Sequence, residues 1–266
     1  MNQPIEPTGH RSVSTASQPI APHPPLRHYY DGTEARQGFL NELFNRTAYQ
    51  YRNIDMATGF GSGLWYRRKA LHQAGLKSSM HVLDVACGPG LVTQGALDLA
   101  GSSGLVIGID PSIGMLREAQ KSPCRNLVRG VGECLPFSDH SFDFLSMGYA
   151  LRHVPDLKGA FTEYRRVLKR GGIVLLLEIS RPRSATLLTL SRFYIKTVLG
   201  KVFSATTGNR DMETLMGYWW DTIEHCVPPE QIMHALKDAG FADCTLKEWW
   251  SGLLREYRAV KTENNL

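Results

Sequence analysis

The sequence predicts an α/β fold with a mostly parallel sheet, and two neighbouring patterns carry this prediction. An apolar strand over residues 82–85 runs into the turn Cys87-Gly88-Pro89-Gly90, where the next helix begins. A second apolar run, 105–109, ends at Asp110, which follows Gly90 by 20 residues. A glycine turn after one strand and an acid after the next are typical of folds that bind a nucleotide at the carboxyl ends of parallel strands.

The other elements alternate in the order that such a sheet requires. Helical periodicity begins near Glu34, with Phe39, Leu40, Leu43 and Phe44 at three- and four-residue spacing. We expect right-handed crossovers to join strands over 82–85, 105–109, 127–131, 142–147 and 173–177. The alternation stops over 184–207, and the sheet is completed by a helix over 229–239 and strands over 244–249 and 255–260.

Composition indicates one domain with a tail. Residues 1–30 contain six prolines and few apolar residues, which predicts a disordered tail. We expect residues 31–266 to form a single domain with a substrate lid at about 184–228. With 266 residues, 42% of them hydrophobic, the chain is long enough for one large core, and it contains no internal repeat.

Targeting signals and cysteine usage point to the cytoplasm. No apolar stretch reaches the ~18 residues that span a bilayer, and the N-terminus lacks the apolar core of a signal peptide. The five cysteines show no metal-ligand spacing, and their odd number argues against a disulfide framework. We therefore expect a cytoplasmic protein without a metal site.

The net charge of +5 is unevenly distributed, which raises the question of a nucleic-acid partner. Six basic residues and no acid lie between Arg181 and Arg210. After the expected fourth strand, however, the chain reads Ser146-Met147-Gly148-Tyr149-Ala150. This run lacks the Asn/Asp-Pro-Pro-aromatic motif of enzymes that methylate base amines. We expect no nucleic-acid partner.

Two features of the glycine turn favour a cationic nucleotide ligand over a dinucleotide. Thr93 stands where the third glycine of the dinucleotide fingerprint would fall. Asp84 lies inside the strand, and a carboxylate there would repel a diphosphate. S-adenosylmethionine carries both an adenosine and a positive charge, so it satisfies both features.

The chain resembles class I S-adenosylmethionine-dependent methyltransferases over about 44–261, most closely the C-methyltransferases of ubiquinone and menaquinone biosynthesis. The resemblance implies a three-layer, Rossmann-like methyltransferase sheet of seven strands, the last antiparallel, with N-terminal helices and a lid insertion after strand 5. It rests on 82–90, 108–112, Leu135-Pro136-Phe137-Ser138-Asp139, Ser141-Phe142-Asp143, Ala150-Leu151-Arg152-His153-Val154, 164–169, 171–172, 177–182, 218–223 and 239–241.

The resemblance also implies the cofactor site, with S-adenosyl-L-homocysteine as the product. The expected contacts are Asp84, Ala86, Gly88, Pro89, Gly90, Asp110, Pro111, Met115, Gly132, Glu133 and Gly148. By rough alignment, Tyr51 and Arg67 are candidates to hold the cofactor's carboxylate. Two alternatives stay open: Asp110 could simply cap the following helix, and Asp84 could be a buried acid bonded to backbone amides.

The chain departs from its relatives at two of these positions and at the neighbouring residue 131. Val131 stands where relatives usually have Asp or Asn, Pro89 replaces a frequent Thr, and Gly148 a frequent Ser. Valine cannot accept a hydrogen bond from the adenine amino group, so adenine recognition would rest on backbone groups and apolar walls. The departures leave open a catalytically degenerate, cofactor-binding subunit of a biosynthetic complex.

Arg152 and His153 are the candidate catalytic pair, at the Arg-Asn position of the quinone-pathway relatives. Carbon methylation of a phenol requires the phenolate, which Arg152 would stabilise, while His153 would accept the proton. The alternative is that Arg152 pairs structurally with Asp156 or Asp143 and His153 only caps the loop. Further candidates for the base are Tyr218, Asp221 and His225.

The substrate is expected to be an apolar, aromatic, quinol-like or phenolic small molecule. Trp219 and Trp220 predict an aromatic wall to which one of them contributes. The apolar and basic segment 184–207 predicts a lid, a peripheral membrane contact or a packing helix, and a homodimer surface is a further alternative. Carbon methylation in quinone or secondary metabolism leads, with oxygen or nitrogen methylation of a natural product as the alternative.

Overall fold

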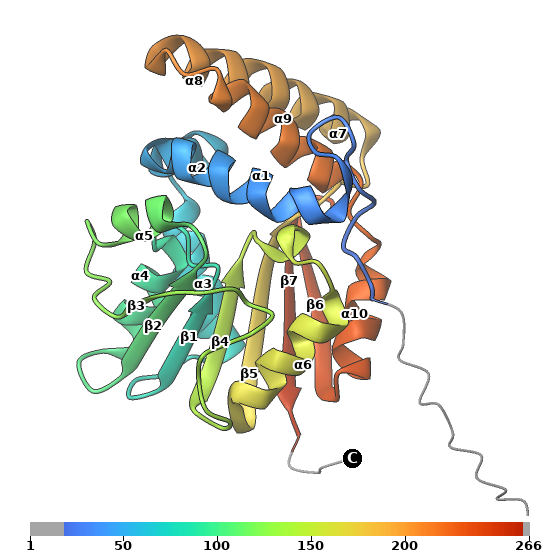
Figure 1. Ribbon diagram of the computed structural model, residues 1–266. Coiled ribbons are helices and arrows are strands. Elements are labelled where there is room, and N and C mark those ends of the chain that lie inside the picture. The colour runs from blue at the N-terminus through green and yellow to red at the C-terminus, as the bar shows by residue number, and fades with distance from the viewer. Residues whose placement is uncertain (1–18, 263–266) are drawn as a thin grey trace, which may run out of the picture.

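The computed structural model describes residues 19–262 and has three layers (Figure 1). One sheet of order β3-β2-β1-β4-β5-β7-β6 forms the middle layer, and β7 runs antiparallel to both of its neighbours. The predicted seven-stranded fold is therefore confirmed. The strands are β1 (His81–Val85), β2 (Leu105–Asp110), β3 (Leu127–Arg129), β4 (Phe142–Gly148), β5 (Leu168–Ile179), β6 (Phe241–Trp249) and β7 (Leu254–Lys261).

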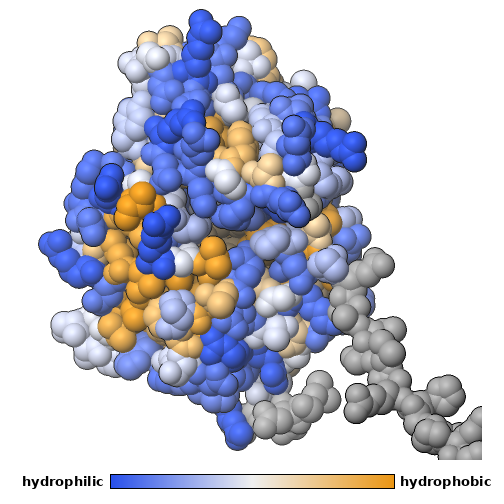
Figure 2. Space-filling view, in the orientation of Figure 1, coloured by the Kyte–Doolittle hydropathy of each residue, from blue (hydrophilic) through white to orange (hydrophobic). Residues whose placement is uncertain are grey.

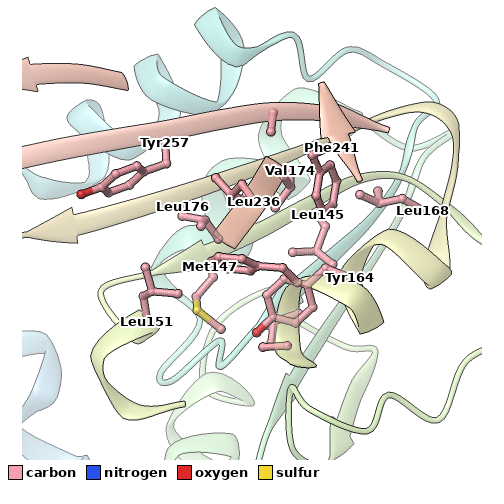
Figure 3. Close-up of a cluster of buried hydrophobic side chains, with 14 of the residues drawn as sticks. Leu145, Met147, Leu151, Tyr164, Leu168, Val174, Leu176, Leu236, Phe241 and Tyr257 are labelled. Atoms are coloured by element: carbon pink, nitrogen blue, oxygen red, sulfur yellow. The ribbon is translucent and has the colours of Figure 1, made fainter. Parts of the chain in front are cut away.

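Helices cover both faces of the sheet. On one face, α6 (Leu157–Val167) and α10 (Pro229–Asp238) enclose the largest core cluster; Figure 3 shows Tyr164 and Leu236 facing Leu145 and Leu176 of the sheet. On the other face, α3 (Gly63–Ala74) and α4 (Leu91–Ala100) pack on β1, β2 and β5. α5 (Ile113–Ala119) follows β2. Because both faces are covered, the central strands are almost continuously apolar.

A separate group of helices stacks over the edge where the parallel strands end (Figure 1). The N-terminal part consists of α1 (Gly32–Thr47), η1 (Ala48–Gln50) and α2 (Tyr51–Gly59). The expected lid consists of α7 (Ala185–Arg192), the π-helix η3 (Phe193–Leu199), α8 (Gly200–Thr207) and α9 (Asp211–Glu224). These two parts share a second hydrophobic cluster, which includes Leu40, Ile54, Ile195 and Trp220.

Residues 19–30, the last part of the predicted disordered tail, pack on the domain. Residues 1–18 lie outside the described residues. The Ile20 amide donates to Asp156 at 2.8 Å, and the Val227 amide donates to the Pro22 carbonyl at 2.8 Å. Leu26 and Tyr30 are buried in the second cluster. These few apolar side chains anchor a segment whose proline content alone favours disorder.

Most element boundaries agree with the sequence prediction, with differences at the sheet margins. β3 ends at Arg129 rather than at 131, and β5 begins at Leu168 rather than at 173 because Phe142 pairs with Leu168 across a bulge. Within residues 19–262, no helix is long and apolar enough to cross a membrane. The same residues contain no group of three or more His, Cys, Asp and Glu side chains arranged to hold a metal ion.

Candidate active site

A cavity of about 430 Å³ lies between the carboxyl ends of the strands and the overlying helices. Its lining includes every predicted cofactor contact except Gly90, together with His153, Tyr51 and Arg67. Arg152 is not part of the lining. One cavity thus collects residues from loops after β1, β2, β3 and β4, which the sequence places up to 64 positions apart.

The glycine turn after β1 forms the floor of this cavity. Ala86, Gly88 and Gly90 have φ of 51°, 55° and 80°, a conformation that glycine adopts without strain. No atom lies within 4 Å of the place where a Cβ of residue 88 would stand, so the backbone is open to a ligand there. Gly90 is the N-cap of α4, and a Cβ at this position would come within 2.9 Å of Cys124 Sγ. Gly90 therefore shapes the turn from outside the cavity.

Asp110 ties the ends of β1 and β2 together. Its Oδ2 accepts from the Gly88 amide and its Oδ1 from the Ser112 amide, both at 2.8 Å. The N-cap of α5 is Ser112, whose hydroxyl accepts from the Met115 amide, so Asp110 is not needed as the cap. A carboxylate has about four lone-pair sites, so Asp110 keeps acceptor capacity for the hydroxyls of a ribose.

Asp84 is fully buried at the cavity wall. Its Oδ2 accepts from the Thr93 hydroxyl at 2.6 Å and its Oδ1 from the Ser146 hydroxyl at 2.7 Å. Asp84 is therefore a buried, hydrogen-bonded acid, as the alternative expected, but its donors are side-chain hydroxyls and not backbone amides. Burial raises the pKa of Asp84 to about 6, and burial also raises the pKa of Asp110 to about 6.

These raised pKa values predict that affinity for S-adenosyl-L-homocysteine falls on acidification. Ribose hydroxyls donate more strongly to a carboxylate than to a carboxylic acid. With the folded-state pKa of Asp110 near 6, about a tenth of the carboxyl is ionised at about pH 5. We expect calorimetry to show up to a tenfold weaker Kd at about pH 5 than at about pH 7.

The effect of acidification on stability is opposite to its effect on affinity. Folding raises both pKa values above the ordinary 3.8, so the folded state binds more protons between about pH 4 and 6. The contribution of these two carboxyls to the free energy of unfolding therefore rises as the pH falls through this window. Affinity that stays constant from about pH 7 to 5 would contradict the assignment of Asp110.

The loop after β3 offers an apolar wall where the resemblance led us to expect a polar side chain. Val131, Gly132 and Glu133 all line the cavity, and burial raises the pKa of Glu133. A Cβ at Gly132 would approach Val85 Cγ1 at 2.8 Å, so the backbone lies close against β1. Figure 2 shows hydrophobic residues gathered beside α5. Ile113, the first residue of α5, and Val131, in the loop after β3, are both exposed. This arrangement suits the flat face of adenine.

The packing of Val92 explains why position 148 has a glycine and not a serine. A Cβ at this position would stand 2.5 Å from Val92 Cγ2, so the valine occupies the space that a serine side chain needs. We expect Gly148→Ser to lower the free energy of unfolding by about 1–3 kcal/mol through overpacking. In urea titrations the double variant Gly148→Ser/Val92→Ala should lose less than the sum of the two single variants. Strict additivity would show that the two positions are not in steric conflict.

Arg152 is placed differently from its predicted catalytic position. The side chain is fully buried, and its Nε donates to Glu178 Oε2 at 2.9 Å. Nη1 donates to the Thr222 hydroxyl at 2.7 Å, and Nη2 to the Tyr149 carbonyl at 3.2 Å. The sequence analysis gave a structural ion pair as the alternative role of Arg152. Its partner is Glu178, not Asp156 or Asp143. Arg152 joins η2 (Leu151–His153) to β5 and α9, and its guanidinium has no free face toward the cavity.

His153 lies at the cavity wall as a neutral imidazole. Burial, reinforced by the charges of Arg152 and Arg36, holds its pKa well below 6.5. Its ring stacks on Tyr218 at 5.7 Å and meets Phe44 edge-on at 5.3 Å. The Nδ1 atom is buried and has no hydrogen-bond partner. His153 can accept a hydrogen bond from a ligand, but it is too weak a base to retain a proton.

The other predicted residues separate into two groups. Tyr218, Asp221 and His225 do not line the cavity. The Asp221 carboxylate instead accepts from the Tyr29 hydroxyl at 2.8 Å and from Lys196 Nζ at 2.7 Å. Of the two tryptophans, Trp219 lines the cavity, whereas Trp220 is buried and donates to Glu224 at 2.9 Å. As predicted, one of the pair faces the cavity.

Tyr51 and Arg67 both lie at the cavity, at the end formed by the N-terminal helices. The Arg67 guanidinium forms a two-pronged ion pair with Asp55 and lies 4.9 Å from the centre of the Tyr149 ring. The Nε atom of Arg67 is buried without a partner. The assignment of this end to the cofactor's carboxylate stays a prediction.

Comparison with known proteins identifies the chain. The model of the ubiE/COQ5 methyltransferase family matches residues 32–261, which is most of the sequence. The chain belongs to this family. It is therefore an S-adenosylmethionine-dependent methyltransferase, and the resemblance drawn from its motifs is confirmed.

Individual relatives agree with the family. The Campylobacter jejuni ubiquinone/menaquinone biosynthesis C-methyltransferase UbiE is 29% identical over 235 residues, covering 85% of this chain and 99% of the relative. The Staphylococcus aureus demethylmenaquinone methyltransferase is 28% identical over 240 residues, covering 87% and 97%. This chain is similar to both along nearly their whole length.

Solved structures confirm the fold. A Thermotoga maritima S-adenosylmethionine-dependent methyltransferase, described as a possible histamine N-methyltransferase, superposes with a TM-score of 0.61 at 19% identity, covering 83% of this chain and 99% of that chain. The Haemonchus contortus phosphoethanolamine N-methyltransferase 2, in complex with S-adenosyl-L-methionine, gives 0.58 at 18% identity, covering 87% and 61%.

Proposed function

We propose that this methyltransferase transfers a methyl group to a ring carbon of a reduced quinone or a closely related phenol. The observation that supports this most strongly is the composition of the substrate end of the cavity. Leu40 and Phe44 of α1, Ile195 of η3 and Trp219 of α9 line this end. A flat, apolar ring fits such walls, whereas a phosphorylated or strongly polar substrate would lose its hydration without compensation.

The residues around the cavity fit the methyl donor. The open backbone at Gly88 admits its amino acid part, Asp110 accepts from the ribose, and the apolar loop at Val131 takes the adenine. When bound, S-adenosylmethionine supplies an electrophilic methyl group on a sulfonium. The protein must then hold a ring carbon in line with that group, which accounts for much of the rate.

Carbon methylation also needs two protons to leave the substrate. One leaves a ring hydroxyl, so that the oxygen's electron pair spreads to the ring carbon. The second leaves that carbon after the new C–C bond has formed, which restores the aromatic ring as a phenolate. The phenolate oxygen then takes up a proton again, so that one proton is released overall. His153 stands at the wall with neutral nitrogens, and its low pKa means that it would pass a proton on to solvent rather than hold it.

Metabolite comparison of a deletion strain tests the proposal. If this protein methylates a quinone precursor, the deletion strain accumulates a quinone pool one methylene unit lighter, and the wild-type gene restores the heavier species. An Asp110→Asn gene should not restore it. A quinone pool of unchanged mass in the deletion strain would exclude a quinone as the substrate.

We propose in addition that the mouth of the cavity rests on an anionic lipid surface. Phe60 and Trp65 are 83% and 65% exposed, and Trp250 is also exposed; both tryptophans line the cavity. Lys69 lies 4.7 Å from the centre of the Trp65 ring, so a positive charge accompanies the aromatic rim. Aromatic side chains beside lysine are typical of interfacial binding, and an apolar substrate would enter from the bilayer.

Vesicle sedimentation measures this contact. We expect binding to vesicles that contain phosphatidylserine, and a loss of about 30-fold or more in Phe60→Ser/Trp65→Ser. Burying each exposed aromatic ring in the bilayer contributes about 1 kcal/mol or more to the free energy of binding. Leu190→Ser, which removes another exposed apolar side chain, serves as the control. Equal binding of the double variant and the wild type would contradict the proposed contact.

A further inference from the structure

Arg36 is a buried arginine without a carboxylate partner. It lies on α1 and is 8% exposed. Its Nη2 donates to the Arg152 carbonyl at 2.8 Å and contacts His23 Nε2 at 3.1 Å, and its Nη1 reaches the Val154 carbonyl at 3.4 Å. Among the described residues, no carboxylate lies within ion-pair distance, and the Arg36 Nε atom has no partner. A buried charge of this kind is costly unless an anion neutralises it.

His23 does not neutralise the charge but orients it. Burial lowers the pKa of His23 to about 4, so the ring is neutral. Its Nδ1 lies 2.7 Å from the Pro24 carbonyl, which makes Nδ1 the donor and leaves Nε2 to accept from Arg36. Every hydrogen-bond partner of the guanidinium is therefore neutral. The charge of Arg36 also acts on Glu133, which lies beyond ion-pair distance: burial raises the pKa of Glu133, and the charge of Arg36 offsets part of this rise.

Arg36 lines a second cavity of about 210 Å³, beside the cavity of the candidate active site. His23, Tyr30 and Gln37 also line it, as does His153. Gln37 and His153 belong to the linings of both cavities, so they form the wall that the two spaces share. A path from the first cavity to Arg36 therefore passes Gln37 and His153.

Two residues that line the second cavity have a buried polar atom without a hydrogen-bond partner. These atoms are Arg36 Nε and His153 Nδ1. Tyr218 stacks on His153, and the charge of Arg36 opposes the effect of burial, which raises the pKa of Tyr218 to about 12. Buried polar groups are normally paired. The two unpaired atoms at this wall, one of them on the arginine itself, indicate a place prepared for a polar ligand atom.

We propose that Arg36 is the cation that holds the ionised oxygen of the phenolic substrate, in a subsite formed by the second cavity and His153. The proposal rests on the function proposed above and assigns the phenolate role that Arg152, buried and ion-paired with Glu178, does not meet. The hydroxyl proton leaves to solvent and the electron pair stays on the oxygen, from which it spreads to the ring carbon. His23 is a positioning residue that holds the guanidinium in place.

A phenol that changes colour on ionisation tests this assignment. With the protein saturated by S-adenosyl-L-homocysteine, 4-nitrophenol is titrated by absorbance to obtain the pKa of the bound dye. An opposite charge close to a titratable group shifts its pKa by about 1–3 units. We expect the bound dye to have a pKa lower by about that amount on the wild type than on Arg36→Gln. Arg36→Lys should restore part of the shift, and Arg117→Gln, on the exposed face of α5, should behave like the wild type.

The outcomes separate this proposal from the proposed function. If S-adenosyl-L-homocysteine binds all variants equally but the dye has the same pKa on wild type and Arg36→Gln, the role of Arg36 is refuted and the methyltransferase site stands. If Arg36→Gln does not fold, the wild type alone decides, since its bound dye must ionise at lower pH than the free dye. A dye that does not bind at millimolar concentration also refutes the subsite. Displacement of the dye by benzoate would extend the subsite to carboxylates.

Discussion

Asp110→Asn should weaken the binding of S-adenosyl-L-homocysteine by about 100-fold or more. The carboxylate accepts from the Gly88 and Ser112 amides and has lone pairs left for the two ribose hydroxyls. A carboxamide has one acceptor oxygen, so its NH₂ group would face a donor. Hydrogen bonds to charged groups contribute about 1.5–3 kcal/mol each, and the loss of two of them corresponds to at least about 100-fold in Kd.

Isothermal titration calorimetry gives this Kd directly, and Asp143→Asn is the matched control. Asp143 lies near the amino-terminal end of β4, whereas Asp110 lies at the carboxyl end of β2. Asp143 pairs with Lys169 at 2.9 Å. Its substitution should leave the Kd within a few-fold of the wild type. Equal affinities for Asp110→Asn and Asp143→Asn would remove Asp110 from the cofactor site.

Arg152→Met should lower the free energy of unfolding by about 3–5 kcal/mol. The substitution leaves the Glu178 carboxylate buried, where it also accepts from the Leu151 amide at 2.7 Å. Removing one member of a buried ion pair carries this cost because the other charge stays uncompensated. The tie to Thr222 would also be lost, so α9 would no longer be held to the sheet and Trp219 would lose its fixed place at the cavity.

Urea unfolding distinguishes this structural role from a catalytic one. Arg152→Met/Glu178→Gln should recover a large part of the stability, because the buried charge is then removed together with its partner. Lys121→Met, which breaks an exposed pair with Glu118, should cost less than about 1 kcal/mol. A stable Arg152→Met protein that binds S-adenosyl-L-homocysteine normally but is inactive would restore the catalytic assignment instead.

The sheet could be predicted from the sequence because its strands carry the signal locally. Buried parallel strands read as apolar runs, and the five parallel strands were placed from such runs and the turns between them. The margins were less predictable because pairing, not composition, sets them: β5 begins at Leu168 since that residue pairs with Phe142. The order of residues 19–30 depends on contacts with Asp156 and Val227, which are distant in sequence.

The cofactor end of the site was predictable for a similar reason. Gly88, Asp110 and Gly132 follow consecutive strands, and the topology of a parallel sheet brings the ends of such strands together. Arg152 has the sequence context of a catalytic residue, but only the structure reveals its burial against Glu178. No sequence signal distinguishes Arg36 from other arginines on amphipathic helices. Its isolation from carboxylates is a property of the assembled fold.

Product analysis of a single reaction tests the central claim most directly. The protein is incubated with S-adenosylmethionine that carries a deuterated methyl group and with a reduced, unmethylated naphthoquinone, and the product is analysed by mass spectrometry and NMR. We predict that the label appears on a ring carbon, that both hydroxyls stay free, and that Asp110→Asn forms little product. Label on an oxygen atom, or no transfer by a protein that binds S-adenosyl-L-homocysteine, would contradict carbon methylation of a quinol.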